Sequence, residues 1–126
     1  MTEHFKREEF ACNGVGCCGH SAPISLQLLE NLELLRKAVS EELGKDTPLE
    51  INCGFRCKVH NAKIGGAPDS KHCEGIGADV ATPKGLTDKR FSEIAEKVTA
   101  FRDGGIGLYL GRIHVDIRKG RARWKK

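Results

Sequence analysis

One long amphipathic segment constrains the fold of this chain more than any other feature. Its apolar residues recur every three or four positions, the spacing that marks one face of a helix; they are Leu28, Leu32, Leu35, Val39 and Leu43. Ser25 is a suitable N-cap residue and Gly44 a suitable stop, so the sequence predicts a helix between them. A helix of this kind must bury its apolar face against another layer of secondary structure.

The remaining segments supply that layer as short strands. Alternating or apolar runs predict strands at residues 49–53, 78–81, 106–110 and 112–118, the last two forming a hairpin around Gly111. A short helix is expected at residues 57–64 and a second amphipathic helix from Thr87 to Phe101. This order of elements predicts an α+β fold, a single small domain with an antiparallel sheet flanked by helices.

The length of 126 residues fits one domain. Within it, residues 1–22 are expected to form an irregular N-terminal segment and residues 118–126 a basic C-terminal tail. The tail contains six of the 21 Lys and Arg residues and no acid, whereas the rest of the chain carries 15 basic and 17 acidic groups, a net charge of −2. Such a tail either contacts an anionic polymer or only keeps the protein soluble.

Two absences argue against a membrane or secreted protein. No apolar stretch approaches the roughly 20 residues needed to cross a bilayer, and the first nine residues lack the apolar core of a signal peptide. We therefore expect a soluble protein that is made in the cytoplasm without a secretion signal and does not insert into membranes. We also expect a monomer that binds no nucleic acid.

Six cysteines are the next feature: Cys12, Cys17, Cys18, Cys53, Cys57 and Cys73. In a secreted protein they would suggest three disulfides, but without a signal peptide reduced thiols are expected. No Cys-x-x-Cys pair occurs and adjacent cysteines form a poor chelating pair, so we expect no four-cysteine metal site. The last three cysteines are expected to be small buried hydrophobic residues near the site described next.

Candidate metal ligands come from two segments. Residues 112–118 alternate between polar and apolar, which places His114 and Asp116 on one face of the predicted strand, either as a solvated surface or as a site. Upstream, His72 ends a loop and Asp79 lies on a strand behind two glycines that permit a sharp turn. Two histidines and one carboxylate with room for water are a typical ligand set of a catalytic Zn²⁺ site.

Several ordered motifs resemble those of the zinc D-alanyl-D-alanine peptidases, a family of cell-wall hydrolases with a hedgehog-like fold. They are Cys53-Gly-Phe-Arg56, Asn61, Gly65-Gly66-Ala67, Ser70-x-His72, Gly75-x-Gly-Ala-Asp79 and Ile113-His114-Val-Asp116. The similarity runs from about residue 52 to residue 124 and is greatest to small phage and prophage members. It implies that His72, Asp79 and His114 bind Zn²⁺, that Arg56 contacts substrate or stabilises the oxyanion, and that Ser70 contacts substrate.

The chain departs from this family at the general base. Several relatives carry Glu, Asp or His three positions before the last ligand, where this chain has Gly111. Asp116 shares the strand face of His114 and is the predicted general base; the alternative is that it orients His114 or Arg56. Glu74 is a weaker candidate for the base.

Two cysteines also depart from the family pattern. Cys53 replaces the usual serine before Gly54. Cys73 directly follows the ligand His72 and could compete for the metal, although we expect it to be buried and structural.

The resemblance implies a zinc metallopeptidase that hydrolyses an amide bond in the stem or cross-link peptides of peptidoglycan. It would be a carboxypeptidase or an endopeptidase, used as a phage endolysin or in wall remodelling, and would act on the cell wall after release. The alternative is a non-catalytic, zinc-stabilised module that binds an anionic polymer through residues 118–126.

Overall fold

The computed structural model describes residues 2–126 of the chain. The helical elements are η1 (Arg7–Phe10), α1 (Leu26–Leu43), α2 (Lys58–Lys63), α3 (Asp88–Ala95) and α4 (Thr99–Arg102). The strands are β1 (Ile51–Cys53), β2 (Gly77–Ala81), β3 (Gly105–Tyr109), β4 (Arg112–Asp116) and β5 (Ala122–Lys125). The predicted α+β class is confirmed.

The five strands form one sheet in the order β1-β2-β4-β3-β5. Neighbouring strands are antiparallel except for β3 and β5, which are parallel. The sheet is therefore mixed, and the prediction of a purely antiparallel sheet is wrong. The difference arises because residues 118–126 do not end as a tail but return along β3.

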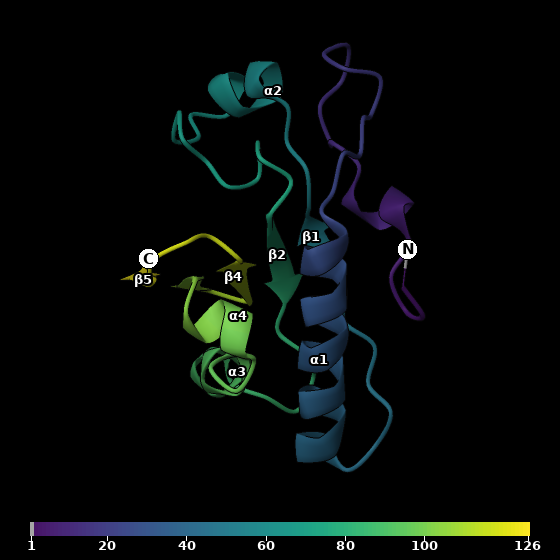
Figure 1. The fold of residues 1–126 in the computed structure, drawn as a ribbon, viewed down its shortest axis with the longest axis vertical. Coiled ribbons are helices and arrows are strands. Elements are labelled where there is room, and N and C mark those ends of the chain that lie inside the picture. Colours follow the sequence, from purple (N-terminus) through teal and green to yellow (C-terminus); the bar gives the residue numbers. More distant parts are fainter. Residues whose placement is uncertain (1) are drawn as a thin grey trace.

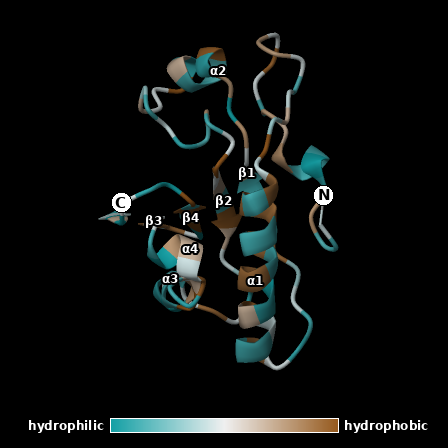
Figure 2. Cartoon of the chain, viewed as in Figure 1, coloured by the Kyte–Doolittle hydropathy of each residue, from teal (hydrophilic) through white to brown (hydrophobic). Residues whose placement is uncertain are grey.

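Helix α1 is the predicted amphipathic helix. The Ser25 hydroxyl accepts a hydrogen bond from the backbone N–H of Leu28, and Gly44 ends the helix with φ of 69°, a left-handed conformation that glycine adopts without strain. Leu28, Leu32, Leu35 and Val39 are fully buried. Hydrophobic and hydrophilic residues both lie along the helix (Figure 2), so its buried stripe faces the core while the opposite side remains exposed.

Helices α1, α3 and α4 supply the apolar residues that cover one face of the sheet (Figure 1). Phe91 and Ile94 of α3 and Phe101 of α4 are buried there with Val80 and Val115 of the strands. The N-terminal segment adds two buried rings to this core, Phe5 and Phe10. The short helix α2 lies near the N-terminal loop, at the opposite end of the molecule from α3 (Figure 1).

The second predicted helix is interrupted. Helix α3 ends at Ala95, and Val98 is extended, with φ of −91° and ψ of 111°, before α4 begins. Val98 and Thr99 are both β-branched, and such residues lose side-chain freedom in a helix. The break still leaves both Val98 and Phe101 buried, so the apolar pattern is kept although the helix is not continuous.

Arginines anchor the C-terminal segment to the domain. Arg123 binds Glu96 at 2.7 Å, and Arg118 binds Asp116 at 2.7 Å. Trp124 lies over the ring of His114, with ring centroids 5.1 Å apart. The segment is thus part of the folded domain. Among residues 2–126, no helix is both long and apolar enough to span a membrane.

Candidate metal centre

The sheet face opposite the helices carries the candidate ligands. Successive residues of a strand point to opposite faces, so Asp79 of β2 and His114 of β4 lie on the face that Val80 and Val115 do not share. The register of β2 with β4 places Asp79 directly beside His114. The register of β3 with β4 places Gly107 on the other side of His114.

Glycines flank the polar residues of this face because larger side chains would not fit. A Cβ on Gly77 would lie 3.0 Å from Cε1 of His114, and a Cβ on Gly105 would lie 2.6 Å from Oδ1 of Asp116. A Cβ on Gly107 would lie 2.8 Å from Cζ2 of Trp124. These glycines leave space for His114, for the carboxyl group of Asp116 and for the indole of Trp124.

His72 reaches the same place from the turn at residues 71–75, which precedes β2. Its Nδ1 is 2.8 Å from the carbonyl oxygen of Gly54, at the end of β1. The backbone N–H of Arg56 donates to the carbonyl of His72 at 3.1 Å. These two contacts fix the turn and the imidazole ring against the segment that follows β1.

Three possible metal-ligand atoms lie close together. His114 Nδ1 lies 3.1 Å from Asp79 Oδ1 and 3.2 Å from His72 Nε2, and His72 Nε2 lies 3.2 Å from Asp79 Oδ1. Atoms bound to one zinc ion at about 2.0–2.1 Å in tetrahedral geometry are separated by about 3.3 Å. The three donors therefore fit a single metal ion and leave a fourth coordination position for water or substrate.

In each histidine, the ring nitrogen that points away from Asp79 has a hydrogen-bond partner, and this partner determines which nitrogen is free to bind a metal ion. Nδ1 of His72 faces the Gly54 carbonyl, and Nε2 of His114 faces the Asp116 carboxylate at 2.7 Å. Both partners are acceptors, so each of these nitrogens carries the hydrogen. In the neutral rings the lone pairs of His72 Nε2 and His114 Nδ1 then point toward Asp79, as metal ligation requires.

The local charges favour a cation between these residues. Burial lowers the pKa of His72, but Asp79 and Cys53 outweigh burial and raise it to about 10. Burial raises the pKa of Asp79, but hydrogen bonds from His114 and His72 hold it well below its usual range. Both shifts favour positive charge between the imidazoles and the carboxylate, and a divalent metal ion bound there would supply it.

Asp116 lies behind His114, away from the point where the three donors meet. Its side chain is fully buried, and it accepts hydrogen bonds from His114, from the Gly105 N–H at 3.0 Å and from the Arg118 guanidinium at 2.7 and 2.8 Å. Burial raises the pKa of Asp116, but the bonds from His114 and Arg118 hold it well below its usual range. The contact with His114 Nε2 fits the alternative role that the sequence left open, orientation of the His114 ring.

The three donors lie in a cleft of about 540 Å³. Two parts of the chain that are distant in sequence line it. One is the segment at residues 64–72, and the other is formed by strands of the sheet, including β5. Five basic and two acidic side chains line it: Arg56, Lys71, Arg112, Arg118, Lys126, Asp69 and Asp79. Glu74 is not part of the lining; its carboxylate is half-exposed and pairs with Lys71 at 2.9 Å.

Arg56 and Ser70 are neighbours on the cleft wall. The Arg56 guanidinium donates from Nε to Asn61 Oδ1 at 2.8 Å and from Nη2 to Ser70 Oγ at 3.1 Å. The Ser70 hydroxyl also accepts from the backbone N–H of His72 at 3.2 Å. Because both acceptor positions of the hydroxyl are used, its own hydrogen remains available to a ligand.

The family model of peptidase M15 matches residues 3–116, from the N-terminal segment to the end of β4. The chain belongs to the peptidase M15 family. Members of this family are metallopeptidases, so the substrate is a peptide and the activity is hydrolysis. The search of curated proteins found no match.

Tyr109 and Trp124 of this M15 peptidase line the cleft, and neither was predicted from the sequence as a site residue. Trp124 donates from Nε1 to the hydroxyl of Tyr109 at 2.7 Å, and the guanidinium of Arg112 lies over the Tyr109 ring at 4.6 Å. The signal that could have found them is the Gly-x-Gly of β3: two glycines on one strand face indicate a side chain packed against them.

The burial and the grouping of the cysteines differ from what the sequence predicted. Cys53, Cys57 and Cys73 are half-buried rather than buried. Cys53, and not Cys73, lies beside the metal centre, in a group with His72 and Asp79. Cys57 lies elsewhere, in a group with Cys12, Cys17 and Cys18. The sequence spacing did not indicate this group of four, because folding brings together thiols from separate segments.

Proposed function

We propose that this M15 peptidase is a zinc-dependent peptidoglycan hydrolase that cleaves an amide bond in stem or cross-link peptides. The observation that carries the proposal is the meeting of His72 Nε2, Asp79 Oδ1 and His114 Nδ1 within 3.2 Å of one another in an open cleft. Histidine nitrogen and carboxylate oxygen are ordinary zinc ligands. A zinc ion held there would polarise the scissile carbonyl and lower the pKa of water to about 7.

The residues around the donors have separate roles in this proposal. Arg56, held by Asn61 and Ser70, offers a fixed guanidinium for a substrate carboxylate or for the oxyanion that develops during hydrolysis. Ser70 donates its hydroxyl hydrogen to the peptide. Asp116 keeps the Nδ1 lone pair of His114 free by accepting from Nε2.

The charge of the cleft supports an anionic peptide as substrate. Five basic side chains and two acidic ones line it, and one of the two acids, Asp79, is a proposed metal ligand. Two of the basic groups are paired with acids outside the lining, Lys71 with Glu74 and Arg118 with Asp116. The remaining basic groups would attract the free carboxylates that stem peptides of peptidoglycan carry. The protein would meet this substrate after release to the cell wall.

Purified cell walls provide the direct test. We expect a zinc-loaded preparation to lower the turbidity of a wall suspension and to release peptides with new amino termini. Removal of the metal by a chelator should abolish this release, and added zinc should restore it. Mass analysis of the released peptides would identify the bond that is cut and so distinguish a carboxypeptidase from an endopeptidase.

Intact walls together with bound zinc would instead favour the non-catalytic binding module. That alternative relies on residues 118–126 as a free basic surface. Three of its arginines form ion pairs within the chain, Arg118 with Asp116 and both Arg121 and Arg123 with Glu96. These pairs reduce the positive charge that is available to a polymer.

An Asp116→Asn variant should distinguish a positioning residue from a general base. If Asp116 orients His114, loss of its charge should weaken zinc binding by roughly 10–100-fold, and activity should return toward the wild-type value at saturating zinc. A zinc titration and turnover at saturating zinc measure the two effects. Unchanged zinc affinity with a loss of about 10²–10⁴-fold in turnover would show that Asp116 is the base.

A further inference from the structure

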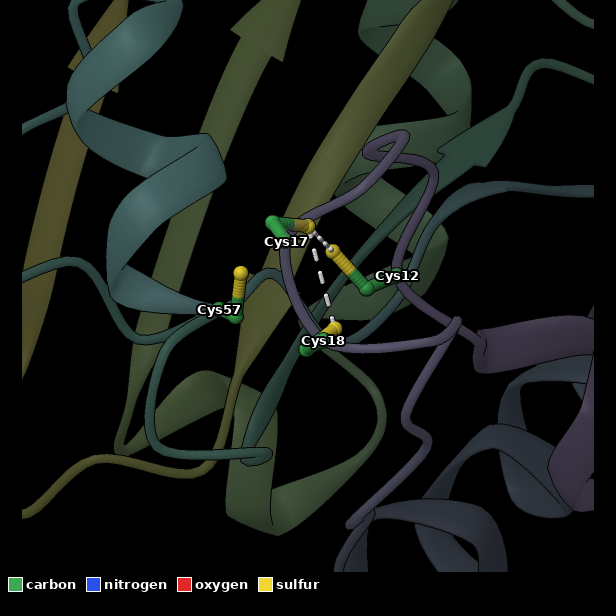
Figure 3. A group of neighbouring side chains, drawn as sticks. All are labelled: Cys12, Cys17, Cys18 and Cys57. Carbon is green, nitrogen blue, oxygen red and sulfur yellow. Dashed lines mark hydrogen bonds between the residues drawn. The ribbon is translucent and has the colours of Figure 1, made fainter.

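Four thiols gather between the N-terminal loop and the start of α2, and none of them lines the cleft. Cys12, Cys17 and Cys18 come from the N-terminal loop, and Cys57 is the N-cap residue of α2 (Figure 3). All four sulfur atoms lie within 4.8 Å of one another. Cys12 is buried and the other three are half-buried.

The spacing of the sulfurs suits one tetrahedral ion. Cys17 Sγ is 4.0 Å from Cys12 Sγ and 3.9 Å from Cys18 Sγ. Four thiolates bound to zinc at about 2.3 Å in tetrahedral geometry are about 3.8 Å apart. A disulfide would need two sulfurs at about 2.05 Å. The adjacent cysteines take part because the chain bends at residues 15–20 and turns both sulfurs to the same side.

The loop around the thiols has little apolar packing of its own. It contains no regular secondary structure between residues 11 and 25, and Val15 is 85% exposed. Its backbone nevertheless passes close to the cluster: a Cβ on Gly14 would lie 2.6 Å from Cys17 Sγ and 2.8 Å from Cγ of His60. A bound ion would supply the cohesion that this loop cannot obtain from a hydrophobic core.

Backbone N–H groups already point at two of the sulfurs. The N–H of Ser21 donates to Cys18 Sγ and that of His60 donates to Cys57 Sγ, both at 3.4 Å. Donors of this kind stabilise the negative charge of thiolates and orient them as metal ligands. The loop is also closed by the Cys12 N–H, which donates to the Ser21 carbonyl at 2.8 Å.

We propose that Cys12, Cys17, Cys18 and Cys57 form a second, structural zinc site in this protein. Four protein ligands leave no open position, as in structural rather than catalytic zinc sites. The site would tie the N-terminal loop to the start of α2, directly after Arg56 of the cleft wall. Binding releases the thiol protons and involves no redox step. The proposal does not depend on the function proposed for the cleft.

Metal analysis of matched variants tests this site. We expect about two zinc ions per chain in the wild type and about one in Cys57→Ser and in His114→Ala. Cys73→Ser is the control, because Cys73 belongs to neither group of possible ligands, and it should keep both ions. Cobalt in place of zinc should give thiolate-to-cobalt charge-transfer absorption in the wild type and in His114→Ala but not in Cys57→Ser.

A second measurement uses the wild type alone, so the test holds even if Cys57→Ser fails to fold. In the native zinc-loaded protein we expect an alkylating reagent to modify Cys53 and Cys73 while the four clustered thiols are protected, and a chelator should expose these four. Equal zinc content in Cys57→Ser and Cys73→Ser would overturn the proposal. So would rapid alkylation of all six thiols, or a mass that shows disulfides within the cluster.

Discussion

Replacing His114 by alanine should remove the metal ion from the cleft and lower peptide hydrolysis by about 10³-fold or more. His114 Nδ1 is one of three donor atoms, and its partners His72 Nε2 and Asp79 Oδ1 lie only 3.1–3.2 Å away. Two donors alone cannot hold the ion in the same place. Since metal polarisation supplies several kcal/mol of transition-state stabilisation, its loss corresponds to a rate change of this size.

The control for this variant is His4→Ala. His4 is exposed, does not line the cleft and binds Glu33 through Nδ1 at 2.7 Å, so the variant should keep both the metal and the activity. Circular dichroism would show whether each variant is folded. A folded His114→Ala protein that keeps its full metal content and turnover would refute the assigned ligand set.

Replacing Leu32 by alanine should lower the free energy of unfolding by about 2–5 kcal/mol, the largest stability effect that we expect. Leu32 is fully buried at the centre of the apolar stripe of α1, in the core shared with α3 and the sheet. The change removes buried methyl groups and leaves a cavity that the surrounding helices and strands fill only in part. Urea denaturation followed by circular dichroism measures the difference.

Leu34→Ala on the same helix is the matched control. Leu34 is 53% exposed, so the same chemical change should alter the free energy of unfolding by no more than about 0.5 kcal/mol. Both variants replace leucine by alanine within the same helix, so the change in helix propensity is the same in each. The comparison therefore isolates the effect of burial. Equal effects at the two positions would contradict the orientation of α1.

Local patterns in the sequence predicted most of the secondary structure. The stripe from Leu28 to Leu43 and its two ends predicted α1, because helix periodicity and capping depend only on neighbouring residues. The alternation in residues 112–116 likewise predicted β4 and the common face of His114 and Asp116. The strand β5 was missed, because parallel pairing with β3 and the packing of Trp124 over Gly107 are long-range contacts.

The candidate ligands could be named from residue types and from the resemblance to a known family. That family assignment is confirmed by the match to peptidase M15 over residues 3–116. The role of Asp116 could not be predicted in the same way. Sharing a strand face with His114 is compatible with either role, and the contact between Asp116 and His114 Nε2, which depends on the folded structure, supports the proposed orienting role.

The sequence by itself determined the α+β class, the amphipathic helix and the residue types available for metal binding, since these follow from composition and short-range periodicity. Only the tertiary structure determined which possible metal-ligand atoms lie close enough together to bind one ion. Register places Asp79 beside His114, a turn carries His72 to both, and Cys57 reaches the N-terminal thiols from a distant segment. The physical reason is that coordination needs donor atoms about 3–4 Å apart, and packing between separate segments determines such distances.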